Sequence, residues 1–111
     1  MPYPMKRRAY RPLPYDLTIK KSNIEGLGLF ATEKIKKGIQ LGVSHYNLMG
    51  YSGLGLLRTP LGGFINHSEK PNCKIKVNYM RWMLVTTKNI KPREELTLKY
   101  ETYTVLKKNT N

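Results

Sequence analysis

Hydrophobic and polar residues alternate in several short segments of this chain, and turn-forming residues separate one segment from the next. Alternation with a period of two predicts a strand with one buried face. On this ground we expect strands at residues 17–20, 39–43 and 96–100, the last of them buried on one face. Residues 29–31, 75–77 and 82–86 also look like short strands, the last two joined by a turn around residues 78–81. The sequence contains no long amphipathic helix pattern and no internal repeat. Short strands with frequent turns are typical of an all-β or mainly β fold.

The segments between these strands differ in composition. Residues 1–16 contain four prolines and four basic residues, which predicts an extended arm because proline blocks helices and central strands. We place the domain proper at residues 17–111. Residues 46–63 are rich in Gly and Leu, which fits one short helix or an irregular loop. Residues 66–68, together with Pro71 and Asn72, form a polar cluster typical of a turn.

Length and composition exclude several classes of protein. A chain of 111 residues fits one compact domain. No apolar run approaches the roughly 20 residues of a membrane span. No apolar signal-peptide core follows the basic N-terminus, so we expect an intracellular protein that is not secreted. The single cysteine, Cys73, excludes a disulfide framework and a multi-cysteine zinc site, and two histidines exclude a His-rich metal centre. We expect no metal.

The net charge of +13 calls for an explanation. Such a field favours acidic partners, such as nucleic acid, an anionic membrane surface, an acidic protein or a ribonucleoprotein. The alternative is that the charge serves solubility alone. The basic residues are spread along the chain and do not form a helical stripe.

Taken one at a time, the polar motifs have ordinary explanations. The glycines at 26 and 28 are typical of a sharp turn, although glycine also lets a backbone approach a ligand closely. The 66–68 cluster fits an Asx-type turn. Residues 94–95 fit a solvated acidic surface or local charge balance. Tyr100 fits a packed core tyrosine, and Cys73 fits a small buried residue.

Three motifs in this order resemble one family. They are EGLGLFA at residues 25–31, GFINHS at 63–68 followed by Pro71 and Asn72, and REELTLKY at 93–100. Together they resemble the SET-domain lysine methyltransferases, over residues 17–103. The short length is similar to that of the minimal SET proteins encoded by viruses. A viral protein would lie in the host cytoplasm, nucleoid or nucleus.

The resemblance implies a fold and an activity. The fold is mainly β, the SET β-clip of short sheets with a C-terminal pseudoknot, in which the last strand threads through the loop after the second motif. The activity is transfer of a methyl group from S-adenosylmethionine to a lysine side chain of a protein substrate. The alternative is a catalytically degenerate SET fold that acts as an adaptor for nucleic acid or a host protein.

The resemblance also implies roles for individual residues. Tyr100 matches the catalytic tyrosine. The residues implied to bind the cofactor are Glu25, Gly26, Leu27, Gly28, Tyr46, Asn66 and His67. Tyr51 and Tyr103 are candidates for the walls of a lysine channel, with plain packing as the alternative. A glycine bend exposes backbone groups to the cofactor ammonium and carboxylate, and an asparagine offers both a donor and an acceptor. We expect a homodimer, association with nucleic acid or a nucleoprotein, and no membrane contact.

Several positions depart from the family pattern. Gly63 stands where the family often has Arg, Glu69 where it often has Cys, and Lys99 where it often has an acidic residue. No cysteine-rich segment follows Tyr103, so the family's zinc cluster is missing from this sequence. We expect residues 104–111, the N-terminal arm or a second subunit to close the lysine channel. The segment between Ile39 and Phe64 is short. In the family this region usually contributes to substrate recognition, so the resemblance does not predict the substrate.

Overall fold

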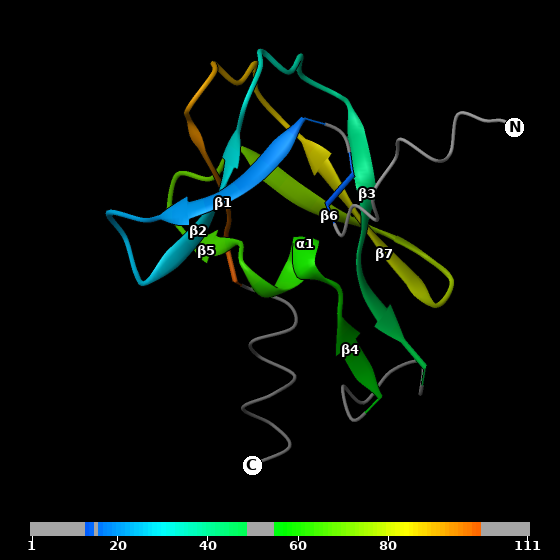
Figure 1. The fold of residues 1–111 in the computed structure, drawn as a ribbon. Coiled ribbons are helices and arrows are strands. Elements are labelled where there is room, and N and C mark those ends of the chain that lie inside the picture. Colours follow the sequence, from blue (N-terminus) through cyan, green and yellow to red (C-terminus); the bar gives the residue numbers. More distant parts are fainter. Residues whose placement is uncertain (1–12, 15, 49–54, 101–111) are drawn as a thin grey trace, which may run out of the picture.

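The computed structural model describes residues 13–14, 16–48 and 55–100, and these residues form two small sheets (Figure 1). The elements are β1 (Leu17–Lys21), β2 (Leu27–Ala31), β3 (Gln40–Asn47), β4 (Leu56–Arg58), α1 (Pro60–Gly63), β5 (Asn66–His67), β6 (Cys73–Asn78), β7 (Arg81–Thr86) and β8 (Glu95–Leu98). The first sheet has the order β1-β2-β8-β5, and the second has the order β4-β3-β7-β6. All pairs are antiparallel except β5 with β8. The mainly β fold predicted from the sequence is confirmed.

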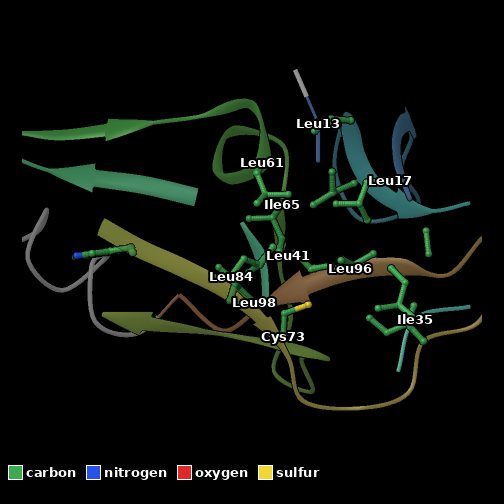
Figure 2. Packing of buried hydrophobic residues seen from close by; sticks show 14 residues of the cluster. Leu13, Leu17, Ile35, Leu41, Leu61, Ile65, Cys73, Leu84, Leu96 and Leu98 are labelled. Carbon is green, nitrogen blue, oxygen red and sulfur yellow. The ribbon is translucent and has the colours of Figure 1, made fainter. Parts of the chain in front are cut away.

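One hydrophobic core joins the two sheets. It contains Leu96 and Leu98 of β8, Leu84 of β7, and Leu61 and Ile65 around α1, all nearly or fully buried. Figure 2 shows these side chains converging between the strands. The side chain of Leu13 also belongs to this core, so the described end of the arm packs on the domain. The domain boundary between residues 16 and 17 remains a prediction.

The observed strand boundaries can be compared with those expected from the sequence. Strands β1, β6 and β7 confirm the segments predicted at 17–20, 75–77 and 82–86. Strand β3 continues to Asn47, past the expected end at residue 43, because β4 and β7 supply partners on both sides. Register shifts at Gln40/Gly42 and Val43/His45 break the alternation that would have revealed this extension. The short helix is α1, whereas β4 was not predicted.

Two local expectations were wrong. Residues 66–67 form strand β5 and not an Asx-type turn, because they pair with Thr97 and Leu98 of β8. Strand β8 is buried on both faces, since Leu96, Thr97 and Leu98 are all at most 7% exposed. The physical reason is that both faces are covered: Leu96 and Leu98 pack in the core, and Thr97 is covered by Asn72, whose backbone N–H and side chain hydrogen-bond to it.

Candidate functional site

The side-chain amide of Asn66 joins segments that are far apart in the sequence. Its Nδ2 lies 2.8 Å from Glu95 Oε2, 3.1 Å from Ser22 Oγ, 3.2 Å from the Glu25 carbonyl oxygen and 3.3 Å from the Leu27 carbonyl oxygen. The three sequence motifs therefore meet at one amide.

Ser22 shapes the bend that precedes the two glycines. The Ser22 hydroxyl accepts hydrogen bonds from the backbone N–H groups of Ile24, at 2.8 Å, and Glu25, at 3.3 Å. The same hydroxyl donates to the Glu95 carboxylate, 2.9 Å from each oxygen. Gly26 closes the bend with a φ of 42°, a conformation that other residues rarely adopt. The bend is thus held by a residue that the sequence patterns did not single out.

The second glycine of this motif makes room for a carboxylate. A Cβ atom at Gly28 would lie 2.2 Å from Glu95 Oε2. Glu95 is half-buried and hydrogen-bonded to Ser22 and Asn66, so it is neither a solvated surface residue nor a simple charge balance. The signal that could have located it is its place at the start of a strand whose next three residues are buried.

Asn72 fastens the segment after β5 to the backbone of β8. Its Oδ1 accepts from the Thr97 N–H at 2.8 Å, and its Nδ2 donates to the Glu95 carbonyl at 2.9 Å and to Glu94 Oε2 at 3.2 Å. On the other side of the same segment, β5 pairs with β8, and the Ser68 N–H donates to the Leu98 carbonyl at 2.9 Å. The segment 66–72 therefore wraps across the last strand, which is the contact expected of the pseudoknot.

Tyr100 is held from two directions. Its hydroxyl donates to the carbonyl of Ile65, and its backbone N–H donates to His67 Nδ1 at 2.9 Å. The rings of His67 and Tyr100 also pack together, with centroids 5.3 Å apart at an interplanar angle of 59°. Because the hydroxyl proton points to Ile65, the phenolic oxygen keeps lone pairs that can accept a hydrogen bond from another group.

The partners of His67 determine its neutral tautomer. Since Nδ1 accepts the Tyr100 N–H, the proton of the neutral ring lies on Nε2, which is 2.9 Å from Glu69 Oε2. Lys99 Nζ lies 3.5 Å from Glu69 Oε1. The hydrogen bond from His67, and secondly the charge of Lys99, lower the pKa of Glu69. Glu69 and Lys99, two of the three departures from the family pattern, are thus paired with each other beside Tyr100.

Three tyrosines were also candidates, for cofactor binding or for the lysine channel. Tyr46 lies on β3, opposite Leu57 of β4 and Arg81 of β7, and its side chain is 39% exposed. It lies on the second sheet, whereas Asn66 and His67 lie on the first, and its cofactor role stays a prediction. Tyr51 and Tyr103 lie outside the described residues, so their channel role stays a prediction as well.

Two buried groups do not behave as reactive groups. Burial raises the pKa of the Cys73 thiol to about 12, which keeps it protonated and poorly nucleophilic. Burial, followed by the charge of Arg58, lowers the pKa of His45 to about 4. Its ring lies 2.8 Å from Ser44 Oγ, which donates to the Trp82 carbonyl at 3.1 Å. His45 is therefore a neutral core histidine at neutral pH.

Comparison with known proteins gives one family match. A family model described as the SET domain matches residues 44–101, more than half of the chain. The motif at residues 25–31 lies outside that match. No curated protein matches the chain at a significant level. No helix among the described residues is long and apolar enough to cross a membrane.

Several solved structures share the fold. A Plasmodium falciparum protein assigned as a histone methyltransferase is 26% identical with a TM-score of 0.64, and the match covers 78% of this chain and 94% of that one. The methyltransferase domain of human PR domain-containing protein 2 is 21% identical with a TM-score of 0.62, covering 80% and 79%. A Polycomb Repressive Complex 2 of Chaetomium thermophilum, a humanized mutant, is 22% identical with a TM-score of 0.64, covering 78% of this chain but 15% of that one. The last two similarities concern the fold alone.

Proposed function

Because this chain belongs to the SET-domain family, we propose that it transfers a methyl group from S-adenosylmethionine to a lysine side chain of a protein substrate. The observation that carries the proposal is the meeting of the three motifs at neighbouring residues: Asn66 donates to the Glu25 carbonyl, and His67, next to it, accepts from the Tyr100 N–H and packs against the Tyr100 ring.

The groups around Asn66 fit the amino-acid end of the cofactor. Within the described part of the chain, Asn66 Oδ1 accepts no hydrogen bond, and the carbonyl oxygens of Glu25 and Leu27 lie beside the same amide. Oxygen acceptors of this kind suit an ammonium group. The Leu27 side chain is 52% exposed, so the bend borders solvent where a cofactor can enter. We assign the methionine end of the cofactor to residues 25–28 and 66–67.

The reaction asks mainly for positioning. S-adenosylmethionine, when bound, supplies a methyl group already activated on sulfur. The target amine needs a free lone pair, so it has to lose its proton before transfer. We expect the phenolic oxygen of Tyr100 to accept a hydrogen bond from this amine and align it, because its own proton is committed to Ile65. Alignment of two reacting groups can contribute several kcal/mol to the rate.

His67 and Glu69 act as positioning residues in this proposal. His67 holds the Tyr100 backbone through Nδ1, and its other nitrogen is oriented by Glu69. A carboxylate behind a histidine determines which ring nitrogen carries the proton. The chain thus uses Glu69, where the resemblance led us to expect cysteine, to orient the residue that holds Tyr100.

A comparison of two tyrosine variants tests the proposal. Tyr100→Phe should lower methyl transfer from radiolabelled S-adenosylmethionine into fractionated lysate by about 100-fold, because one preorganised polar contact to the reacting group is lost. Cofactor affinity measured by calorimetry should change little. Tyr79→Phe is the matched control, since Tyr79 is 86% exposed on the β6–β7 turn. Mass spectrometry of the labelled band would identify the substrate lysine.

The outcomes separate the two functional classes. Label that disappears only in Tyr100→Phe supports the enzyme. Wild-type protein that neither binds the cofactor nor transfers label would leave the adaptor alternative. The homodimer expected from the resemblance is tested separately, by light scattering of the full chain with and without cofactor.

A further inference from the structure

Two basic turns lie next to each other at one end of the molecule. Residues 33–37 and 88–94 together carry six basic and two acidic residues. Figure 1 shows the two segments side by side at the top of the view, in cyan and orange. Between them is a cleft of about 470 Å³ lined by Lys34, Lys36, Asn89, Ile90 and Lys91. We call this the lysine cleft. It lies outside the cluster around Asn66 and Tyr100.

The backbone under the lysine cleft is firmly held. Ile35 and Ile90 are fully buried and form a bridge with two hydrogen bonds, of 2.9 Å and 2.7 Å. Lys34 and Lys36 flank Ile35 in the sequence, and Lys91 follows Ile90. The Lys37 N–H donates to Asn89 Oδ1 at 2.9 Å, which ties the two turns together again. The buried isoleucines therefore anchor a scaffold whose neighbouring lysines are all exposed.

The charge of the lysine cleft is not neutralised locally. Glu33 is exposed in the same turn, and Glu94 is half-buried and hydrogen-bonded to Asn72 and to the Lys91 N–H. Among the residues that the structure describes, the ion pairs all involve Glu69, and none involves Lys34, Lys36 or Lys91. Three lysine side chains thus line one cleft that has no carboxylate in its lining.

We propose that the lysine cleft binds the phosphate backbone of nucleic acid. Lysine is a flexible point charge that suits phosphate, whereas planar carboxylates are recognised best by the two-pronged guanidinium of arginine, which does not line this cleft. Phosphate contacts are independent of base sequence and position a protein on the polymer. The overall charge of +13 would add long-range attraction.

This inference does not depend on methyl transfer, because the lysine cleft and the Tyr100 cluster share no residue. Its consequence for the proposed function is recruitment: an enzyme held on nucleic acid would meet lysines of proteins bound to the same polymer. Failure of either proposal would leave the other standing.

Two charge-matched triple variants test the inference. One is Lys34→Gln with Lys36→Gln and Lys91→Gln, and the control is Lys74→Gln with Lys76→Gln and Arg81→Gln, exposed positions on β6 and β7. The measurement is fluorescence anisotropy of a labelled duplex of about 20 base pairs, as DNA and as RNA, between about 50 and 200 mM salt. Circular dichroism checks that both variants fold.

The expected result is a loss that depends on position and not on charge alone. The cleft variant should bind about tenfold more weakly at the upper salt concentration, and its log–log salt slope should fall by about two to three, one for each lost phosphate contact. The control should weaken by less than about threefold. Binding of both DNA and RNA supports recognition of the phosphate backbone. Binding of only one of them would identify that polymer as the ligand.

Three results would overturn the inference. Equal weakening of both triple variants would mean that only the net charge matters. Polyglutamate and unlabelled duplex can be compared as competitors at equal charge concentration. If polyglutamate displaced the labelled duplex equally well, the cleft would be assigned to acidic protein. Wild-type protein that binds neither polymer would remove nucleic acid as the ligand.

Discussion

The two sheets of this molecule are held together in different ways. In the sheet β4-β3-β7-β6 the long strands pair over many residues: β3 has 8 residues, and β6 and β7 have 6 each. In the sheet β1-β2-β8-β5 the contacts to β8 are short, with two paired residues from β2 and two from β5. We refer to these as the hairpin sheet and the site sheet.

Side-chain hydrogen bonds supply in the site sheet what backbone pairing supplies in the hairpin sheet. Asn72 bonds the backbone of β8 at two points, and Asn66 and Glu95 connect the bend before β2 to the same strand. Buried hydrogen bonds of such a network make the fold more rigid and help to specify it. The comparison teaches that the site sheet is specified by a few polar residues, whereas the hairpin sheet is specified by its pattern and packing.

Alanine at two glycines should affect the two sheets differently, and this is the largest expected effect. In Gly62→Ala the new Cβ would lie 2.2 Å from the backbone oxygen of Ser44, which cannot move without shifting β3. We expect a loss of more than about 3 kcal/mol in the free energy of unfolding, measured by urea denaturation. In Gly28→Ala the clashing atom is the end of the Glu95 side chain, so stability should fall less and cofactor affinity more.

Gly63→Ala is the control for both variants. A Cβ at this position meets nothing within 4 Å, and its φ is not in the positive range. The variant should be as stable as the parent protein or slightly more stable, because alanine favours the helix. If Gly62→Ala and Gly63→Ala unfolded at the same urea concentration, close packing of α1 on the hairpin sheet would be refuted.

Acidification should weaken the hairpin sheet through His45. Its pKa is lowered to about 4 in the folded protein, so between pH 6.5 and 4 the unfolded chain binds a proton that the folded one excludes. His45 therefore supports stability fully above pH 6.5, and that support declines as the pH falls towards 4, by about 3 kcal/mol in total. Urea denaturation across this range measures the loss.

Imidazole resonances measured by NMR provide a check that does not require a variant. The His45 signals should stay those of a neutral ring until the pH approaches 4. Titration of His45 near its ordinary pKa would contradict the burial argument. His67→Gln should leave the His45 titration unchanged, because His67 lies in the site sheet.

Removal of the Asn72 amide should weaken the site sheet, by less than Gly62→Ala weakens the hairpin sheet. Asn72→Ala deletes bonds to Thr97, Glu95 and Glu94 at a position that is 6% exposed. We expect a loss of about 2–3 kcal/mol in thermal or urea unfolding, since buried backbone groups of β8 lose their partner. Asn78→Ala, an exposed position at the end of β6, should cost far less. Equal losses in the two variants would show that Asn72 does not fasten β8.

The smallest expected effect concerns Glu69. The pKa of the Glu69 carboxyl is lowered by the hydrogen bond from His67 and secondly by the charge of Lys99. The stabilisation from these two partners is therefore present above the ordinary carboxyl pKa and is lost as the pH falls through the lowered value. Glu69→Gln should leave stability nearly unchanged at every pH, because the group is exposed. Methyl transfer by Glu69→Gln should decline modestly. Glu69→Asp should retain more activity than Glu69→Gln if its shorter carboxylate still reaches His67.

The sequence predicted the hairpin sheet in part and the chemistry of the site sheet in part. The two strands β6 and β7 were located from their short apolar segments and the turn residues between them. Alternation located β8 but predicted burial on one face only, whereas both faces are covered. It missed the end of β3, where register shifts and buried polar residues hide the period. The resemblance brought out Asn66, His67 and Tyr100, while the role of Ser22 and the hydrogen-bond partners of Asn72 and Glu95 emerged only in the structure.

What the sequence determined by itself is local: the short strands, the glycine bend, the single buried cysteine and the excess of basic charge. The tertiary structure decided which of the distant residues meet. Glu95 became a partner of Ser22, 73 positions away, and the Tyr100 N–H became a donor to His67, 33 positions away. The physical reason is that hydrogen bonds of this range depend on strand order and register, which the packing of the whole core decides and no short stretch of sequence encodes.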